Sequence, residues 1–366
     1  MSKIVEVIAQ LDQLAPPAYQ ESYDNSGLLV GDFNAKVSGI LVCLDCTEAV
    51  VEEAIARQCN LIVAHHPIIF KGLKKLNGKN YVERTILKAI KNDVAIFAIH
   101  TNLDHVLGGV NSKIAEKLEL QDVKILAPKS DTLLKLTVFV PLANAPFVLN
   151  ALYAAGAGQI GNYSECSFST TGTGTFKPNE VANPVLGQRG VLETVAENRI
   201  EVIFPSYLQH KIEAAMHAAH PYEEVAYYVS NLLNTNQNVG AGAIGNLEKP
   251  LSATEFLGFL KQKMNLKVVR HTNLTDNVIQ KVAVCGGAGG FLLKDAISQK
   301  ADAFVTADYK YHEFFDADNR LVLCDIGHYE SEVYTKELLQ DYLSDKFPNF
   351  ATILCQTNTN PVNYYF

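Results

Sequence analysis

Two consecutive histidines stand at the end of a short apolar run, and this arrangement limits the fold more than any other feature of the chain. The run 61–64 is too short and too rich in β-branched residues for a helix, so it predicts a buried strand. Pro67 cannot continue a strand ladder, so the strand ends at or near His65 and His66. Open α/β sheets place ligands at such strand ends. The pair therefore predicts a dinuclear metal site, with a hydrogen-bonded pair that caps the strand as the alternative.

A second apolar run, 94–99, also leads into residues that can hold a metal. Asp104 follows this run, flanked by His100 and His105, and the glycines that come next predict a loop here. The two flanking histidines are expected to support a site rather than to bind a metal. Asp104 alone would also suit the N-cap of a helix.

A third apolar run, 321–326, is followed by Gly327 and then by His328 and Glu332. Residues 331–343 carry a helical pattern, and a spacing of four would place His328 and Glu332 on one helix face. Each member of these clusters has an ordinary surface explanation, but three separate strand ends are harder to attribute to chance. The candidate metal ligands are His65, His66, Asp104, His328 and Glu332. Such mixed nitrogen and oxygen donors suit zinc, iron or manganese.

These segments match a known family. The matching segments are SYDNSGLLVG at 22–31, AHHP at 64–67, HTNLD at 100–104, VCGGAG at 284–289, AFVTAD at 303–308 with Lys310 and His312, and GHYESE at 327–332. They occur in the family's order over nearly the whole chain. The chain thus resembles the NIF-three-like dinuclear-metal proteins, also known as type 2 homologues of GTP cyclohydrolase 1. Tyr23 stands where many relatives carry tryptophan.

The resemblance implies a metal centre and an assembly. It implies that the five candidate residues hold two divalent metal ions per chain, with zinc favoured over iron or manganese. It also implies a toroidal homohexamer whose metal sites face an internal cavity, which would restrict substrates to small molecules or flexible ends.

The resemblance further implies a metal-dependent hydrolase of a nucleotide-like substrate. The family name suggests opening of the guanine ring of GTP, and a phosphoester hydrolase fits the same metals. His312 is the candidate for proton transfer, with a supporting histidine at the rim as the alternative. The other function class is a non-catalytic, metal-binding regulatory or interaction protein, because the sequence shows no guanine-reading cluster.

The order of predicted elements indicates an α/β fold with two domains. Strands and helices alternate in both the N-terminal and C-terminal parts, which predicts a largely parallel sheet flanked by helices. Because the candidate ligands come from both parts, residues 1–128 and 243–366 are expected to form one discontinuous metal-binding domain. Residues 129–242 read as β-α-β-β-α-β, which predicts an inserted α+β ferredoxin-like domain. This insert resembles the nitrogen-regulator and copper-tolerance proteins.

Composition narrows the partners and the compartment. The chain of 366 residues is 48% hydrophobic and 19% charged, with a net charge of −8. No basic stripe is visible, so nucleic acid is not an expected partner. No apolar run reaches the ~20 residues of a transmembrane helix. Seven scattered cysteines are typical of a reduced, cytoplasmic protein, and Cys43 and Cys46 are expected in a core strand rather than in a redox site.

Three further segments have two interpretations each. The glycine-rich loop 156–161 predicts a structural turn, with anion binding by its amides as the weaker alternative. The run 286–290 between a strand and a helix is a weak phosphate signal, explained nearly as well by close backbone packing. His220 and Glu223 resemble a metal pair, but Pro221 favours a loop.

Overall fold

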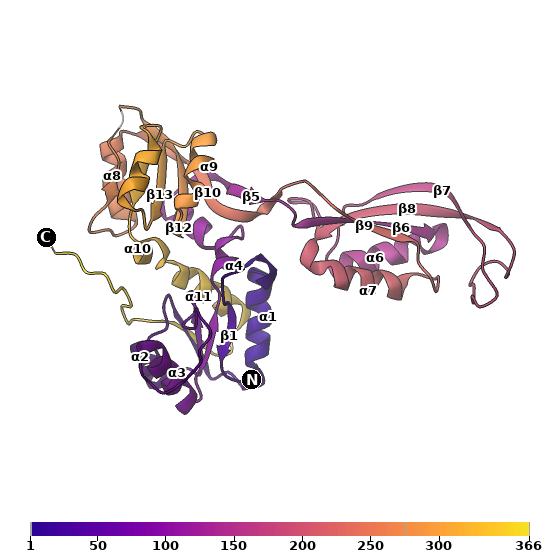
Figure 1. Cartoon of the computed structure of the whole chain (residues 1–366), viewed down its shortest axis with the longest axis horizontal. Coiled ribbons are helices and arrows are strands. Elements are labelled where there is room, and N and C mark those ends of the chain that lie inside the picture. The colour runs from indigo at the N-terminus through magenta and orange to yellow at the C-terminus, as the bar shows by residue number, and fades with distance from the viewer. Residues whose placement is uncertain (1, 275, 366) are drawn as a thin grey trace. The chain divides into compact units, whose positions relative to one another are not determined.

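The computed structural model describes residues 2–274 and 276–365 of the chain. They form two compact units (Figure 1). Unit 1 comprises Met1–Ala127 and Asn238–Phe366, and unit 2 comprises Pro128–Gln237. Within the described residues, no helix has the length and apolar character needed to cross a bilayer.

The first sheet of unit 1 carries the double histidine. Its strands lie in the order β1 (Gly27–Val30), β4 (Ala95–Ala98), β3 (Leu61–Ala64), β2 (Gly39–Cys43) and β15 (Ala351–Leu354). All neighbours are parallel except β1 and β4. Strands β2, β3 and β4 are buried along their whole length, as expected for parallel strands covered on both faces. Helices α2 (Glu48–Ala56) and α3 (Tyr81–Lys91) supply part of the core on one face.

The second sheet of unit 1 carries the C-terminal candidates. Its strands lie in the order β11 (Arg270–His271), β14 (Val322–Asp325), β13 (Ala303–Ala307), β12 (Ile279–Ala288), β10 (Asn236–Leu251) and β5 (Gln121–Lys129). Strands β12, β13 and β14 are parallel, whereas β10 and β11 run antiparallel to their neighbours β12 and β14. The sequence did not predict β5 and β10, because their glycines and charged residues obscure the alternation of a strand.

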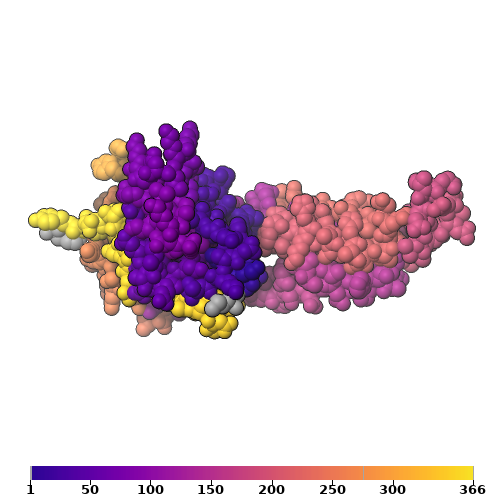
Figure 2. Space-filling model, turned by 90° about the horizontal axis from the view of Figure 1, so that it is seen from below, coloured from indigo at the N-terminus to yellow at the C-terminus, as the bar shows by residue number. Residues whose placement is uncertain are grey.

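One hydrophobic core joins the two sheets. Val42 and Val63 of the first sheet belong to the same buried cluster as Val284 and Val305 of the second. Helices α1 (Ile4–Leu14), α5 (Val110–Lys117), α8 (Ala253–Lys263) and α11 (Thr335–Lys346) complete this cluster. N-terminal and C-terminal residues therefore lie side by side, as the indigo and yellow surfaces of unit 1 show (Figure 2). The remaining short helices of unit 1 are η1 (Pro17–Tyr19), α4 (Thr101–Asp104), η4 (Gly290–Leu292), α9 (Leu293–Ser298), η5 (Tyr311–Ala317) and α10 (His328–Glu332).

Two local predictions for the candidate ligands were wrong. Asp104 does not lie in a loop but ends the one-turn helix α4, whose first amide, that of Thr101, donates to the Asp24 carboxylate. The C-terminal helix does not begin at Ser331 but at His328, as the separate helix α10 that precedes α11. Gly327 makes this early start feasible, because its φ of 91° lets the chain leave β14 and turn at once into the helix.

Unit 2 is a four-stranded antiparallel sheet with two helices. Its elements are β6 (Leu133–Pro141), η2 (Leu142–Asn144), α6 (Ala145–Ala155), β7 (Phe168–Phe176), β8 (Glu193–Pro205), η3 (Ser206–Leu208), α7 (Gln209–Ala219) and β9 (Tyr227–Asn231), and its strands are ordered β7-β8-β6-β9. Alternate residues of β6 and β8, such as Leu136 and Val202, pack against α6 and α7. The predicted strand 166–171 lies within this region but begins at Phe168 and continues to Phe176.

Candidate metal centre

The candidate ligands gather where parallel strands of both sheets end. His65 and His66 follow β3, Asp104 closes the helix after β4, and His328 and Glu332 begin and end the helix after β14. Three groups of donor atoms lie within 4.8 Å of one another: His65, His66 and His100; His66, His328 and Glu332; and His65, Asp104 and Glu332. These groups contain all five sequence candidates, and they add His100.

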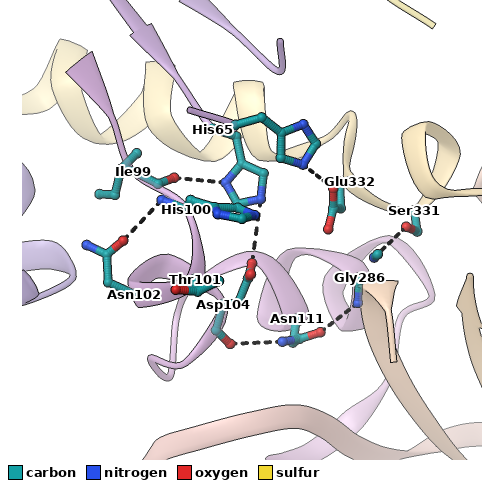
Figure 3. Close-up of polar contacts among 12 residues, drawn as sticks. His65, Ile99, His100, Thr101, Asn102, Asp104, Asn111, Gly286, Ser331 and Glu332 are labelled. Carbon is teal, nitrogen blue, oxygen red and sulfur yellow. Dashed lines mark hydrogen bonds and ion pairs between the residues drawn. The ribbon is translucent and has the colours of Figure 1, made fainter. Parts of the chain in front are cut away.

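The His65 imidazole is fully buried and lies beside the carboxyl group of Asp104. Its Nδ1–H donates to the Ile99 carbonyl at 2.9 Å, because a carbonyl oxygen can only accept (Figure 3). Burial lowers the pKa of His65 to about 3, so the ring is neutral and Nε2 carries a lone pair. Nε2 lies 3.6 Å from Asp104 Oδ1, and no hydrogen bond reaches either atom. Burial raises the pKa of Asp104 well above its usual range, so an ionised carboxylate at this place needs a cation beside it. A cation held between these two atoms would supply the partner that both lack.

The second half of the cluster centres on the Glu332 carboxylate. Glu332 Oε2 lies 3.0 Å from both His66 Nε2 and His328 Nε2, and these two nitrogens are 3.4 Å apart. Burial alone would lower the histidine pKa values, but carboxylate contacts raise the pKa of His66 to about 10 and that of His328 to about 9. Burial alone would raise the pKa of Glu332, yet the two histidines hold it well below its usual range. A divalent cation could replace the two Nε2 protons without changing the charge.

Each imidazole of the cluster is fixed through its other nitrogen. His66 Nδ1 lies 2.8 Å from Asp45 Oδ1, and His328 Nδ1 lies 2.7 Å from Asp308 Oδ2. Metal-binding histidines commonly donate Nδ1–H to a carboxylate or carbonyl, which fixes the ring and turns Nε2 toward the metal. The donor types, the unpartnered atoms and these outer contacts therefore fit a metal centre.

The cluster opens into a large cavity within unit 1. This cavity has a volume of about 1550 Å³, and His66, Asp104, His328 and Glu332 line it. Exposed aromatic side chains also line it, namely Tyr23, Phe70, Tyr81 and Phe291. The cluster is therefore accessible to a small molecule that carries a ring.

Comparison with known proteins identifies the family of this chain. The sequence model of the Duf34/NIF3 family (NGG1p interacting factor 3) matches residues 2–361. The chain belongs to the Duf34/NIF3 family. Two relatives called GTP cyclohydrolase 1 type 2 homolog, from Bacillus subtilis and Halalkalibacterium halodurans, are 39% and 40% identical over 364 and 363 residues. In both cases the similarity covers 98% of this chain and 98% of the relative.

Solved structures show the same fold for this Duf34/NIF3 protein. A Bacillus cereus protein related to NIF3 is similar with a TM-score of 0.88 at 40% identity, and the match covers 100% of this chain and 99% of the other. A Staphylococcus aureus protein gives a TM-score of 0.80 at 31% identity with the same coverage. The predicted α/β class and the family resemblance are thereby confirmed.

The glycine run of this Duf34/NIF3 protein packs against the cluster. The amides of Gly286, Gly287 and Gly289 already donate to the side chains of Asn111, Ser331 and Thr306. Gly287 has a φ of 60°, and a Cβ there would lie 2.5 Å from Glu332 Oε1. The glycines therefore let the backbone pack closely against Glu332. The weak phosphate interpretation was wrong for these three amides, because side chains of the protein already accept their hydrogen bonds.

The other sequence candidates lie apart from the cluster. His312 is exposed on η5, where its ring stacks on Phe315, and it does not line the cavity described above. In unit 2, the ring nitrogens of His220 contact the Phe139 carbonyl and the Tyr222 amide, which indicates a structural position.

The remaining glycine and cysteine motifs are structural as well. In the loop 156–161, the Gly158 amide donates to the Ile203 carbonyl, as a structural turn requires. Cys43 lies in β2 and Cys46 just beyond it, and both are buried free thiols whose pKa burial raises. These contacts agree with the core interpretation of the Cys-x-x-Cys motif.

Sequence reasoning missed the residues that orient the ligands. Asp45 follows β2 and Asp308 follows β13, so both carry the same strand-end signal that identified the candidate ligands. Thr359, in the segment after β15, donates to Asp45 Oδ2 at 2.8 Å and also lines the cavity. No local pattern marks Thr359, because only the fold brings it to Asp45.

Proposed function

We propose that this protein binds two divalent metal ions, most simply zinc, and hydrolyses a small nucleotide-like substrate at them. The observation that carries the proposal is the pair of buried, unpartnered polar atoms, His65 Nε2 and Asp104 Oδ1, beside the carboxylate of Glu332. A buried arrangement of this kind is costly without a cation. The family name of the relatives supports a hydrolytic reaction on a nucleotide.

The donor sets support two ions rather than one. His65 and Asp104 form one set with Glu332, whereas His66 and His328 form another set with the same carboxylate. Each imidazole has one Nε2 lone pair and can serve one ion, but a carboxylate has two oxygens to share. Glu332 is therefore the residue suited to bridge the two ions.

The number of protein donors leaves room for chemistry. Structural zinc sites use four protein ligands per ion, and two ions sharing these five residues fall short of that number. Bound here, such a pair would lower the pKa of a water molecule and neutralise charge on a phosphoryl or carbonyl oxygen. The protein's own contribution is to fix the imidazoles through Asp45, Asp308 and the Ile99 carbonyl.

The walls of the cavity support a planar, polar substrate. Phe70 is half exposed, and its ring lies 5.9 Å from the ring of His100, at the edge of the cluster. Tyr23 and Tyr81 are also exposed and line the same cavity. Exposed aromatic faces beside a metal centre suit stacking of a base, while the bond to be cleaved lies at the ions.

Metal analysis run beside a turnover screen tests this proposal. Protein purified without added metal is analysed for its elements and assayed with GTP and with a phosphodiester. We expect about two ions per chain, and turnover that Asp104→Ala abolishes and the surface variant His271→Gln retains. Two ions without turnover on either substrate class would favour the regulatory alternative, and one ion or none would contradict the dinuclear centre.

A further inference from the structure

His100 lies beside two of the candidate ligands, although the sequence suggested only a supporting role. Its ring centroid lies 5.3 Å from that of His65 and 5.3 Å from that of His66. Its donor atom lies within 4.8 Å of theirs, which are two of the candidate metal-binding nitrogens. Figure 3 shows the His100 ring directly beside that of His65.

The Asp24 carboxylate fixes the His100 ring through its Nδ1 atom. Nδ1 of His100 lies 2.8 Å from Asp24 Oδ1, and the Asp24 side chain is fully buried. Asp24 also accepts hydrogen bonds from the Thr101 amide, the Thr101 hydroxyl and the Ser26 hydroxyl.

The contact with Asp24 at Nδ1 fixes which nitrogen of His100 is available. The carboxylate accepts the Nδ1–H, so Nε2 is the atom left to face the other imidazoles. His66 with Asp45 and His328 with Asp308 have the same arrangement. Carboxylate–histidine pairs of this kind are typical of metal ligands and the groups that orient them.

We propose that His100, oriented by Asp24, is a sixth protein ligand of the dinuclear centre, where its donor atom lies within reach of those of His65 and His66. The second observation that points to a ligand is the fully buried Nε2 of His65, which no hydrogen bond reaches. This proposal rests on the proposed metal centre and assigns a purpose to Asp24 in the segment SYDNSG. It makes the centre richer in nitrogen on the side of the first sheet.

Cobalt substitution tests the ligand directly in the unaltered protein. Ring N–H protons of histidines bound to Co²⁺ give strongly shifted proton NMR signals that disappear in D₂O. Each of the four imidazoles in the cluster keeps a hydrogen-bonded Nδ1. We expect four such signals, from His65, His66, His100 and His328, and loss of one in His100→Gln. Three signals in the unaltered protein would overturn the proposal.

Metal affinity provides a second readout that needs no turnover. Competition with a chromophoric chelator should show about tenfold weaker Zn²⁺ binding in His100→Gln, and a smaller loss in Asp24→Asn, which keeps the ring but weakens its anchor. His271→Gln, an exposed histidine of β11, should bind as the unaltered protein does. Equal affinity in all variants would overturn the sixth ligand while leaving the dinuclear centre intact. A failure to take up cobalt at all would contradict both proposals.

Discussion

The candidate centre has two halves, one with His65 and Asp104 and one with His66, His328 and Glu332. The charge of the carboxylate is balanced differently in each half. On the side of the first sheet, His65 is neutral and fully buried, and its Nε2 lies 3.6 Å from Oδ1 of Asp104, whose pKa burial raises well above its usual range. On the other side, Glu332 lies between two histidines whose pKa values it raises. In the first half the Asp104 carboxylate therefore lacks a cationic partner, which a metal ion would supply. The second half balances its own charge with protons, and metal must displace them.

We expect metal binding in both halves to require Glu332, and metal binding in the first half alone to require His65. The double variant His65→Ala, Glu332→Ala should lose both metal ions while the fold remains, because it removes one terminal donor and the shared carboxylate. Elemental analysis with circular dichroism checks this result. Full metal occupancy in a folded double variant would refute the assignment of the site.

The anchoring carboxylates should matter less than the ligands. Asp45→Asn should weaken metal binding about 10- to 100-fold, since the neutral amide holds the His66 Nδ1–H less strongly than the carboxylate does. Chelator competition measures the change. Glu48→Gln, which removes a surface carboxylate paired with Arg84 instead, is the matched control. An affinity unchanged by Asp45→Asn would show that His66 does not need its anchor.

The charge balance of the second half predicts the pH dependence of the metal-free protein. The folded-state pKa values of His66 and His328 are raised to about 10 and about 9, so the stability they contribute is fully present below their ordinary pKa of 6.5. That stability is lost as the pH rises through about 9 to 10. Thermal unfolding of chelator-treated protein should therefore show a falling midpoint in this range. His66→Gln should flatten the fall, and an identical fall in that variant would contradict this origin.

The smallest expected effect comes from the segment after β15. Thr359→Val removes the hydroxyl that donates to Asp45, a loss of about 1 kcal/mol or roughly fivefold in the affinity of the His66 half. Thr357→Val is the control, because that hydroxyl donates to Glu53 instead and does not contact the cluster. Equal metal affinities of these two variants would show that Thr359 does not act through Asp45.

Much of the architecture could be predicted because the signals are local. The runs 39–43, 61–64 and 95–98 are continuous, apolar and β-branched, and they form buried parallel strands as the pattern indicated. The strands β5 and β10 escaped prediction because charged residues in β5 and glycines in β10 interrupt their apolar residues. Helix α10 begins at His328 for a similar reason, since Gly327 and the packing against Gly287 decide where the chain turns.

The sequence by itself determined which residues can bind a metal, because each candidate ligand follows an apolar strand and its chemistry is evident from its type. Only the tertiary structure decided that β3 of one sheet and β14 of the other end at the same place, since a shared core joins the sheets. It also placed three aspartate carboxylates against the Nδ1 atoms of the imidazoles, namely Asp24 at His100, Asp45 at His66 and Asp308 at His328. Hydrogen bonds between residues far apart in the chain leave no periodic signal, and the orientation of a ring depends on them.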